Sequence, residues 1–340
     1  MAQLNERDEL VAAWRALVGD AASVGWRTIE VASAGSCRLR AGRHFPGNEE
    51  AFLVGFSAIE RPASIQLPQG QGFLVSWADL GSESEGRTWI ALCKEDAGNL
   101  DLFSTMADDV RSTLRTLRNA NAIVGLQAFL SRIRAWQEFM RRGADNLLSA
   151  EAEVGLFGEM EFLDSLIASG IPAWQAIDAW QGPLDGLHDF PLGAGAIEVK
   201  STAAPVGFIA KISALEQLDD SLIRPLYLAG VRLALKDSGS TIAERAEQLR
   251  ATFADDDLAL SNFNSRLLHA GLLDAHADKY TRRFVLVSTR LLPVAEGFPR
   301  LTPANVALPI RQARYELDLD LLSITPVELA DALLQIGVSY

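Results

Sequence analysis

Two charged residues lie two positions apart in an apolar segment, residues 195–202, which reads GAIEVKST. Because side chains alternate along a β-strand, Glu198 and Lys200 point to one face while Val199 points to the other. An exposed glutamate and lysine on a half-buried strand would be ordinary. The residues that precede the strand therefore decide the interpretation.

A tight hairpin is indicated just before this strand. Residues 193–194 (Gly-Ala) suit the two loop positions, with the glycine at the first central position of a type II′ turn. In this register, Asp189 lies directly opposite Glu198 on the same face. A turn at residues 194–195 would instead place Asp189 opposite Lys200, so both registers stay open here.

Two carboxylates that are held within about 5 Å of each other repel, and such a pair is usually kept only if a cation lies between them. Oxygen ligands without a nearby histidine favour Mg²⁺ over zinc. Lys200, one pleat from Glu198, would stabilise negative charge on a phosphate while the metal activates a water. Asp, Glu and Lys in this arrangement indicate phosphodiester hydrolysis.

An arginine-rich stretch lies between residues 111 and 143, with seven arginines against one acid. Arg111, Arg115 and Arg118 fall at i, i+4 and i+7, so they share one helix face. This face is either a phosphate-binding stripe or an ordinary solvated surface. The net charge of −13 and the pI near 4.8 argue against a protein that binds nucleic acid indiscriminately.

Length and composition limit the class of protein. A chain of 340 residues with 49% hydrophobic and 22% charged residues is expected to fold into two domains. No apolar run is long enough for a membrane span and the N-terminus is charged, so we expect a cytoplasmic protein without membrane partners. Two cysteines and four histidines without zinc-like spacing make a transition-metal site improbable.

The N-terminal part, residues 1–145, predicts a smaller α+β domain. A helix is expected over residues 4–18, followed by an antiparallel sheet from WRTIEV, SCRLR, AFLVGFS, GFLVSW and RTWIALC. Two helices between residues 104 and 142 should break near 119–121. This domain is a candidate for recognition of a partner or of DNA.

The C-terminal part, residues 146–340, predicts an α/β domain with a mixed sheet flanked by helices. After a first helix we expect strands in AWQAIDAW, LHDFPL and AIEVKST, a helix in KISALEQLDDSL, and a long strand in RPLYLAGVRLAL. Two helices (241–253 and 259–273), strands in RRFVLVSTRLL and IRQARYELDL, and a last short helix complete the order.

The chain resembles a known nuclease superfamily. Asp189 and the Glu198-Val199-Lys200 hairpin, preceded by a helix with Glu159, look like the restriction-endonuclease-like PD-(D/E)XK superfamily. The resemblance is strongest to the bacterial PD-(D/E)XK motif proteins that are associated with phage defence and restriction-like systems. It rests on GLFGEMEFL, AWQGP, HDF, IEVKST, KISALEQLDD and PLYLAGV within residues 150–235, and more loosely on the rest, including RYELDL.

The resemblance implies a restriction-endonuclease-like core and a role for each motif residue. Asp189 and Glu198 would hold Mg²⁺, with Mn²⁺ as a substitute, and the carbonyl of Val199 would be a further ligand. Lys200 would be the catalytic lysine. His188 stands where the superfamily usually has a proline, which weakens only the literal motif.

Two further residues are implied to lie near the site. Glu159 would reach it from the first helix, directly or through water, and we prefer it to Glu153 and Glu161, which lie on other parts of that helix. Asp185 is an alternative ligand to Asp189, but the favoured register places it beyond the lysine. Gln217 is expected near the active site or DNA, or as a helix-face residue bonded to the neighbouring loop.

The leading hypothesis is a Mg²⁺-dependent DNA endonuclease within a restriction or phage-defence system. The acidic net charge indicates that an ATPase or a target-recognition subunit brings it to DNA. Cutting both strands takes two sites, which favours a homodimer. The alternative is a catalytically silent module whose nuclease fold serves DNA binding or assembly.

Overall fold

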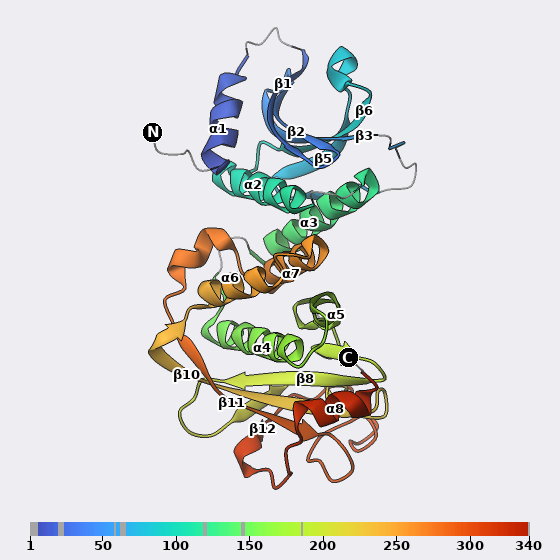
Figure 1. The fold of residues 1–340 in the computed structure, drawn as a ribbon, viewed down its shortest axis with the longest axis vertical. Helices are drawn as coiled ribbons and strands as arrows, with labels where there is room; N and C mark the ends of the chain where they lie inside the picture. The colour runs from blue at the N-terminus through green and yellow to red at the C-terminus, as the bar shows by residue number, and fades with distance from the viewer. Residues whose placement is uncertain are drawn as a thin grey trace. The chain divides into compact units, whose positions relative to one another are not determined.

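The computed structural model describes residues 6–19, 24–57, 59–61, 66–117, 121–143, 147–184 and 186–338. The chain divides into two compact units, Met1–Asn146 and Leu147–Tyr340 (Figure 1). Each unit has its own β-structure and its own hydrophobic core.

The N-terminal unit is built on a six-stranded antiparallel sheet in the order β1-β2-β3-β6-β5-β4. Helices α1, α2 and α3 pack against one face of this curved sheet (Figure 1). The opposite face carries a smaller apolar cluster around Leu53 and Trp89. The elements are α1 (Glu6–Ala16), β1 (Gly25–Ala34), β2 (Cys37–Phe45), β3 (Glu49–Ser57), β4 (Gln69–Gly70), β5 (Phe73–Ala78), η1 (Gly81–Ser84), β6 (Arg87–Lys94), α2 (Leu100–Thr116) and α3 (Ala122–Gly143).

The C-terminal unit has a mixed four-stranded sheet in the order β11-β10-β8-β7, in which β10 runs parallel to β8 and antiparallel to β11. The predicted α/β class with a mixed sheet flanked by helices is therefore confirmed. The elements are α4 (Ala150–Ala168), α5 (Ala173–Ala179), η2 (Gly182–Leu184), β7 (Phe190–Leu192), β8 (Gly195–Thr202), β9 (Ile209–Ile212), β10 (Leu226–Ser240), α6 (Ile242–Thr252), α7 (Asp257–Ala270), η3 (Asp274–Lys279), β11 (Phe284–Pro293), β12 (Tyr315–Asp318), η4 (Leu319–Leu321) and α8 (Leu329–Ile336).

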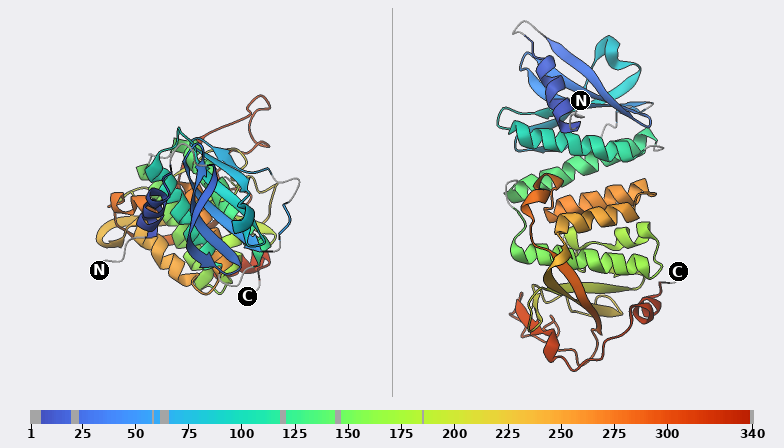
Figure 2. Two further views of the ribbon diagram at one scale, coloured as in Figure 1. Left: turned by 90° about the horizontal axis from the view of Figure 1, so that it is seen from above. Right: turned by 60° about the vertical axis from the view of Figure 1, so that its left-hand side comes forward.

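Both faces of the mixed sheet are covered. On one face, Tyr227 and Ala229 of β10 join a core with helices α4 to α8, and Figure 2 shows α4 along the strands. On the other face, Leu226 and Leu228 join Phe208 and the two-stranded sheet β12-β9. Because successive residues of β10 alternate between the two cores, the strand reads as a continuous apolar run.

Two expected strands are corrected. AWQAIDAW forms helix α5 instead of a strand, and LHDFPL contributes only the three residues Phe190–Leu192. Ala176, Ile177, Ala179 and Trp180 are buried in the first segment, and the larger side chains among them are Ile177 and Trp180. Their spacing of one, three and four positions is that of a helix, and the short apolar run hid it.

The expected helix in KISALEQLDDSL is also wrong. Residues Ile209–Ile212 form strand β9, which pairs with β12, and residues 215–218 and 220–222 form turns. The side chain of Gln217 accepts a hydrogen bond from the backbone N–H of Ser213 at 2.7 Å. Such a side-chain bond to the backbone competes with helix formation.

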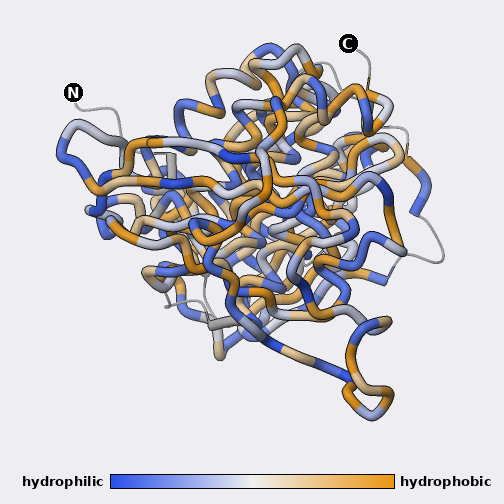
Figure 3. Tube along the Cα trace, turned by 90° about the horizontal axis from the view of Figure 1, so that it is seen from below, coloured by the Kyte–Doolittle hydropathy of each residue, from blue (hydrophilic) through white to orange (hydrophobic). Residues whose placement is uncertain are grey.

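Hydrophobic and hydrophilic residues alternate in short runs along the chain (Figure 3). Within the described ranges, no helix is both long and apolar enough to cross a membrane.

Candidate active site

The hairpin β7–β8 has the register in which residues 193–194 form the loop. Phe190 pairs with Ile197 and Leu192 pairs with Gly195. Gly193 has a φ of +53°, which a residue with a side chain rarely adopts, as a type II′ turn requires at its first central position. The alternative register, shifted by one residue, is therefore excluded.

Asp189 lies immediately before β7, one step beyond the last pair of the hairpin. Its Oδ2 accepts a hydrogen bond from the backbone N–H of Val199 at 2.7 Å. The N–H and C=O of one strand residue point to the same side, because they bond to the same neighbouring strand. The carbonyl of Val199 therefore also lies at the edge that faces Asp189.

Glu198 is the centre of the polar contacts on β8. Its Oε1 accepts hydrogen bonds from Lys200 Nζ at 2.7 Å and from Gln217 Nε2 at 3.0 Å. The side chain is buried, and its Oε2 has no hydrogen-bond partner. His188 Nδ1 is 3.8 Å from this oxygen, beyond hydrogen-bond distance. A buried acceptor that lacks a donor is suited to a ligand.

Gln217 thus contacts the site from the turn that follows β9, although the helix expected there is absent. Its amide nitrogen donates to Glu198 while its oxygen accepts from Ser213 N, so the orientation of the amide is fixed at both ends. Ser213 fixes this amide through its backbone N–H, and a backbone contact of this kind cannot be predicted from the residue type.

Glu159 reaches the site from α4. Ser149 caps this helix by accepting from Ala152 N, and Gly170, with a φ of +101°, follows its end. Trp180 Nε1 donates to Glu159 Oε2 at 2.7 Å. The competing acids of the same helix are engaged elsewhere, as Glu153 pairs with Arg282 and Glu161 with Arg245. Asp185 lies outside the described residues.

A glycine allows two of the carboxylates to approach each other. A Cβ atom at Gly182 would overlap Glu159 Oε2 and Asp189 Oδ1. The backbone N–H of Gln181 also donates to the carbonyl of Asp189 at 2.7 Å. Trp180 and Gly182 are site residues that we did not single out from the sequence, and the signal was their place in the phrase AWQGP.

Burial and mutual repulsion shift the proton affinities of these groups. Burial raises the pKa of Glu159 to about 7, against the hydrogen bond from Trp180 and with the added repulsion of Glu198. Burial, then the charges of Glu198 and Glu159, raise the pKa of Asp189 well above its ordinary value. Burial alone would lower the pKa of Lys200, but Glu198 and Asp189 outweigh it and raise that pKa. Lys200 is therefore an ammonium at neutral pH.

The donor set fits a hard divalent cation. Asp189 and Glu198 offer carboxylate oxygens, one of them buried without a partner, and the Val199 carbonyl lies at the same edge. Three carboxylates share one ammonium, so a cation would offset the surplus negative charge. In the described part of the chain, no three His, Cys, Asp or Glu side chains could hold a metal by themselves. A divalent cation held by so few side chains would complete its coordination with backbone oxygen and water.

The arginine stripe of α2 is corrected. Arg111 is 1% exposed and its guanidinium pairs with Asp108 at 2.8 Å and with Glu9 at 3.3 Å, so it does not face solvent. Arg115 is exposed, and Arg118 lies outside the described residues. Arg111 follows the buried Ala107 by four positions and therefore belongs to the apolar face of the helix.

Comparison with known proteins gives one family. The family model described as "Putative PD-(D/E)XK family member (DUF4420)" matches residues 10–320. No curated protein and no solved structure matches this chain. The family match covers both units and includes the hairpin, the α4 glutamate and the lysine described above. The chain therefore belongs to this PD-(D/E)XK family.

Proposed function

We propose that the C-terminal unit is a metal-dependent nuclease that hydrolyses phosphodiester bonds of DNA, with Mg²⁺ as the cofactor and Mn²⁺ as a substitute. The observation that carries the proposal is the convergence of Asp189, the buried and partly unpartnered Glu198, and a protonated Lys200 at one edge of β8. When bound, the metal supplies Lewis-acid polarisation of the phosphoryl oxygen and a lower pKa for the attacking water.

Each protein group has a role that its contacts support. Lys200 stays charged, so it stabilises negative charge that develops on the phosphate and does not act as the base. Gln217 orients Glu198 through their hydrogen bond. Glu159 lies beside Asp189 across Gly182 and is the candidate to receive a proton from water.

The charge of the unit supports dependence on partners. Residues 147–340 contain 15 Lys and Arg against 26 Asp and Glu, a formal charge of −11. Such a surface repels the DNA backbone. We propose that this protein is a subunit of a restriction or phage-defence system, in which an ATPase or target-recognition subunit delivers DNA and a homodimer supplies two sites.

The same charge favours a second candidate, a catalytically silent module that serves assembly. Retention of all three motif residues, with the contacts between them, supports the enzyme instead. The decisive experiment is cleavage of supercoiled plasmid with and without Mg²⁺, for the protein alone and with cell extract from its source.

The variants for this experiment are Lys200→Ala and, as a matched control, Lys211→Ala. Lys211 lies on the neighbouring strand β9, is 57% exposed and pairs with Glu151. Metal-dependent nicking that is lost only in Lys200→Ala establishes the nuclease. Absence of cleavage in every condition, together with no Mg²⁺ binding by calorimetry, would overturn the enzyme and favour the silent module.

A further inference from the structure

A pocket of about 650 Å³ lies in the N-terminal unit, on the sheet face that the helices leave open. Trp26, His44 and Glu49 form one row of its lining across β1, β2 and β3, because Trp26 pairs with His44 and His44 pairs with Glu49. The rings of Trp26 and His44 are 4.6 Å apart between centroids. A volume of this size suits a small organic ligand.

The lining is strongly acidic. Glu49, Asp79, Glu95 and Asp96 contribute four carboxylates against the single ammonium of Lys94. Lys94 Nζ in turn lies 3.8 Å from Glu50, which does not line the pocket. Cys93 adds no charge, because burial raises the pKa of its thiol to about 12. The pocket therefore repels anions, including phosphate.

One carboxylate oxygen in this lining lacks a donor. Glu49 Oε2 is buried and has no hydrogen-bond partner, and His44 Nδ1 is 3.9 Å from it. Buried acceptors are nearly always paired in folded proteins.

We propose that this pocket binds an organic cation that carries its charge on an apolar or planar body, a quaternary ammonium or a guanidinium. The indole ring of Trp26, against which His44 packs, supplies a face over which such a cation is attracted. The carboxylate of Glu49 supplies a counter-charge from inside the pocket, and the other three carboxylates raise the local concentration of cations.

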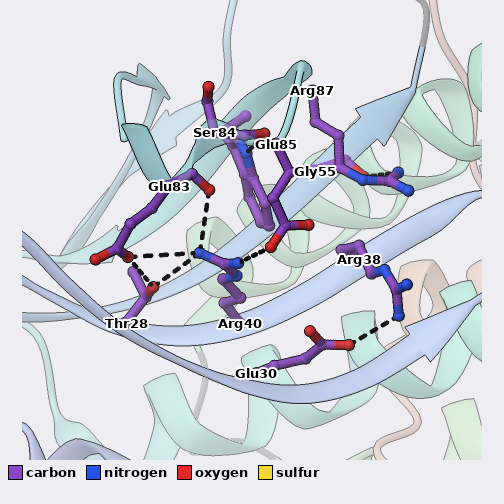
Figure 4. Close-up of polar contacts among 10 residues, drawn as sticks. Thr28, Glu30, Arg38, Arg40, Gly55, Glu83, Ser84, Glu85 and Arg87 are labelled. Carbon is purple, nitrogen blue, oxygen red and sulfur yellow. Dashed lines mark hydrogen bonds and ion pairs between the residues drawn. The ribbon is translucent and has the colours of Figure 1, made fainter. Parts of the chain in front are cut away.

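Elsewhere on the same sheet face, a cation of the protein itself lies beside an aromatic ring and a carboxylate (Figure 4). There the guanidinium of Arg40 lies 4.8 Å from the centre of the Trp89 ring and donates to Glu85 at 2.7 Å. A cation, an indole and a carboxylate are thus already combined within the protein. The pocket presents an aromatic pair and carboxylates without the guanidinium, which is the component that the ligand would bring.

The test is calorimetric titration of the full chain with choline and with dimethylbutanol, in which carbon replaces the charged nitrogen. Choline should bind and the uncharged isostere should not. Glu49→Gln should weaken choline binding about tenfold, while Glu60→Gln, an exposed glutamate outside the pocket, should leave it unchanged. Glu95→Gln, on the exposed rim, is a second variant that does not risk the fold.

Thermal unfolding confirms that each variant is folded before titration. Equal binding of choline and its uncharged isostere would show a merely apolar cavity and overturn the proposal. Absence of choline binding at millimolar concentration, or binding that survives both Glu49→Gln and Glu95→Gln, would overturn it as well. None of these outcomes depends on the nuclease proposal, because the pocket and the candidate active site share no residue.

Discussion

Buried charges are paired in the N-terminal unit but are in surplus at the candidate active site of the C-terminal unit. In the N-terminal unit the buried arginines, Arg40, Arg43, Arg111 and Arg132, each have carboxylate partners. At the candidate active site three buried carboxylates surround one ammonium, that of Lys200. Paired buried charges fix a structure, whereas a surplus of one sign disfavours the empty site and favours a ligand of the other sign. The predictions below test this difference.

The largest effect is expected for Asp189→Asn. Asparagine keeps an acceptor for Val199 N but removes one surplus charge. Mg²⁺ binding and cleavage should fall by about a thousandfold, while the metal-free protein should become more stable, because one buried acid is removed. Calorimetry, plasmid nicking and thermal unfolding measure these three changes. A less stable metal-free variant would contradict the idea of surplus charge.

Removal of a paired charge in the N-terminal unit should lower the free energy of unfolding instead of raising it. Arg132 is 6% exposed and donates to Asp109 at 2.6 Å, so Arg132→Met leaves a carboxylate without its cation. We expect a loss of about 3 kcal/mol in the free energy of unfolding, measured in denaturant. Arg134→Met on the same helix is the control, since Arg134 is exposed and should change stability little. Mg²⁺ binding should not change in either variant.

The stability of the metal-free protein should depend on pH through the raised pKa of Glu159. The folded pKa of Glu159 is about 7, above its ordinary value of 4.5. Its contribution to stability is therefore complete below about pH 4.5 and is lost as the pH rises towards 7. In metal-free buffer this loss amounts to at most about 3 kcal/mol. Glu159→Gln should show a flatter profile than the wild type, and an unchanged slope would rule out the raised pKa.

The smallest effect is expected for a residue that acts through another. Gln217→Ala removes the amide that holds Glu198 but leaves both carboxylates in place. Mg²⁺ affinity should fall about tenfold, as for other residues that orient metal ligands. Gln248→Ala on α6, whose amide donates to Ser240 and accepts from Arg245 outside the candidate site, is the control. Equal affinities for wild type and Gln217→Ala would show that Glu198 needs no support from the turn.

The sequence predicted the hairpin register, and with it the closeness of Asp189 to Glu198, better than it predicted the surrounding elements. Gly193 determined the hairpin, because few residues tolerate its positive φ, and the hairpin then brought Asp189 to Val199 and Glu198. These are local constraints that one stretch of chain contains. The helix α5 was missed because AWQAIDAW is short, and its apolar residues fit the periodicity of a strand as well as that of a helix.

The other predictions failed where contacts between distant parts of the chain determine the local structure. Charge spacing could not say whether Arg111 faces solvent or Asp108, since both arrangements have the same helical period. The turn at Gln217 depends on β12, which pairs with β9 from about a hundred residues away in the chain. The closeness of Glu159 and Asp189 depends on the missing side chain of Gly182, and this steric role can be recognised only when the positions of the two carboxylates are known.

The shortness of β7 has a consequence for association between molecules. β7 begins at Phe190, so it leaves β8 beyond Ile197 unpaired on that side, and unpaired strand edges recruit strands from other chains. The carboxylate of Asp189 occupies the N–H of Val199 that an incoming strand would use. The residue that we assign to metal binding thereby also protects the edge against aggregation, and Asp189→Ala should precipitate more readily than Asp189→Asn.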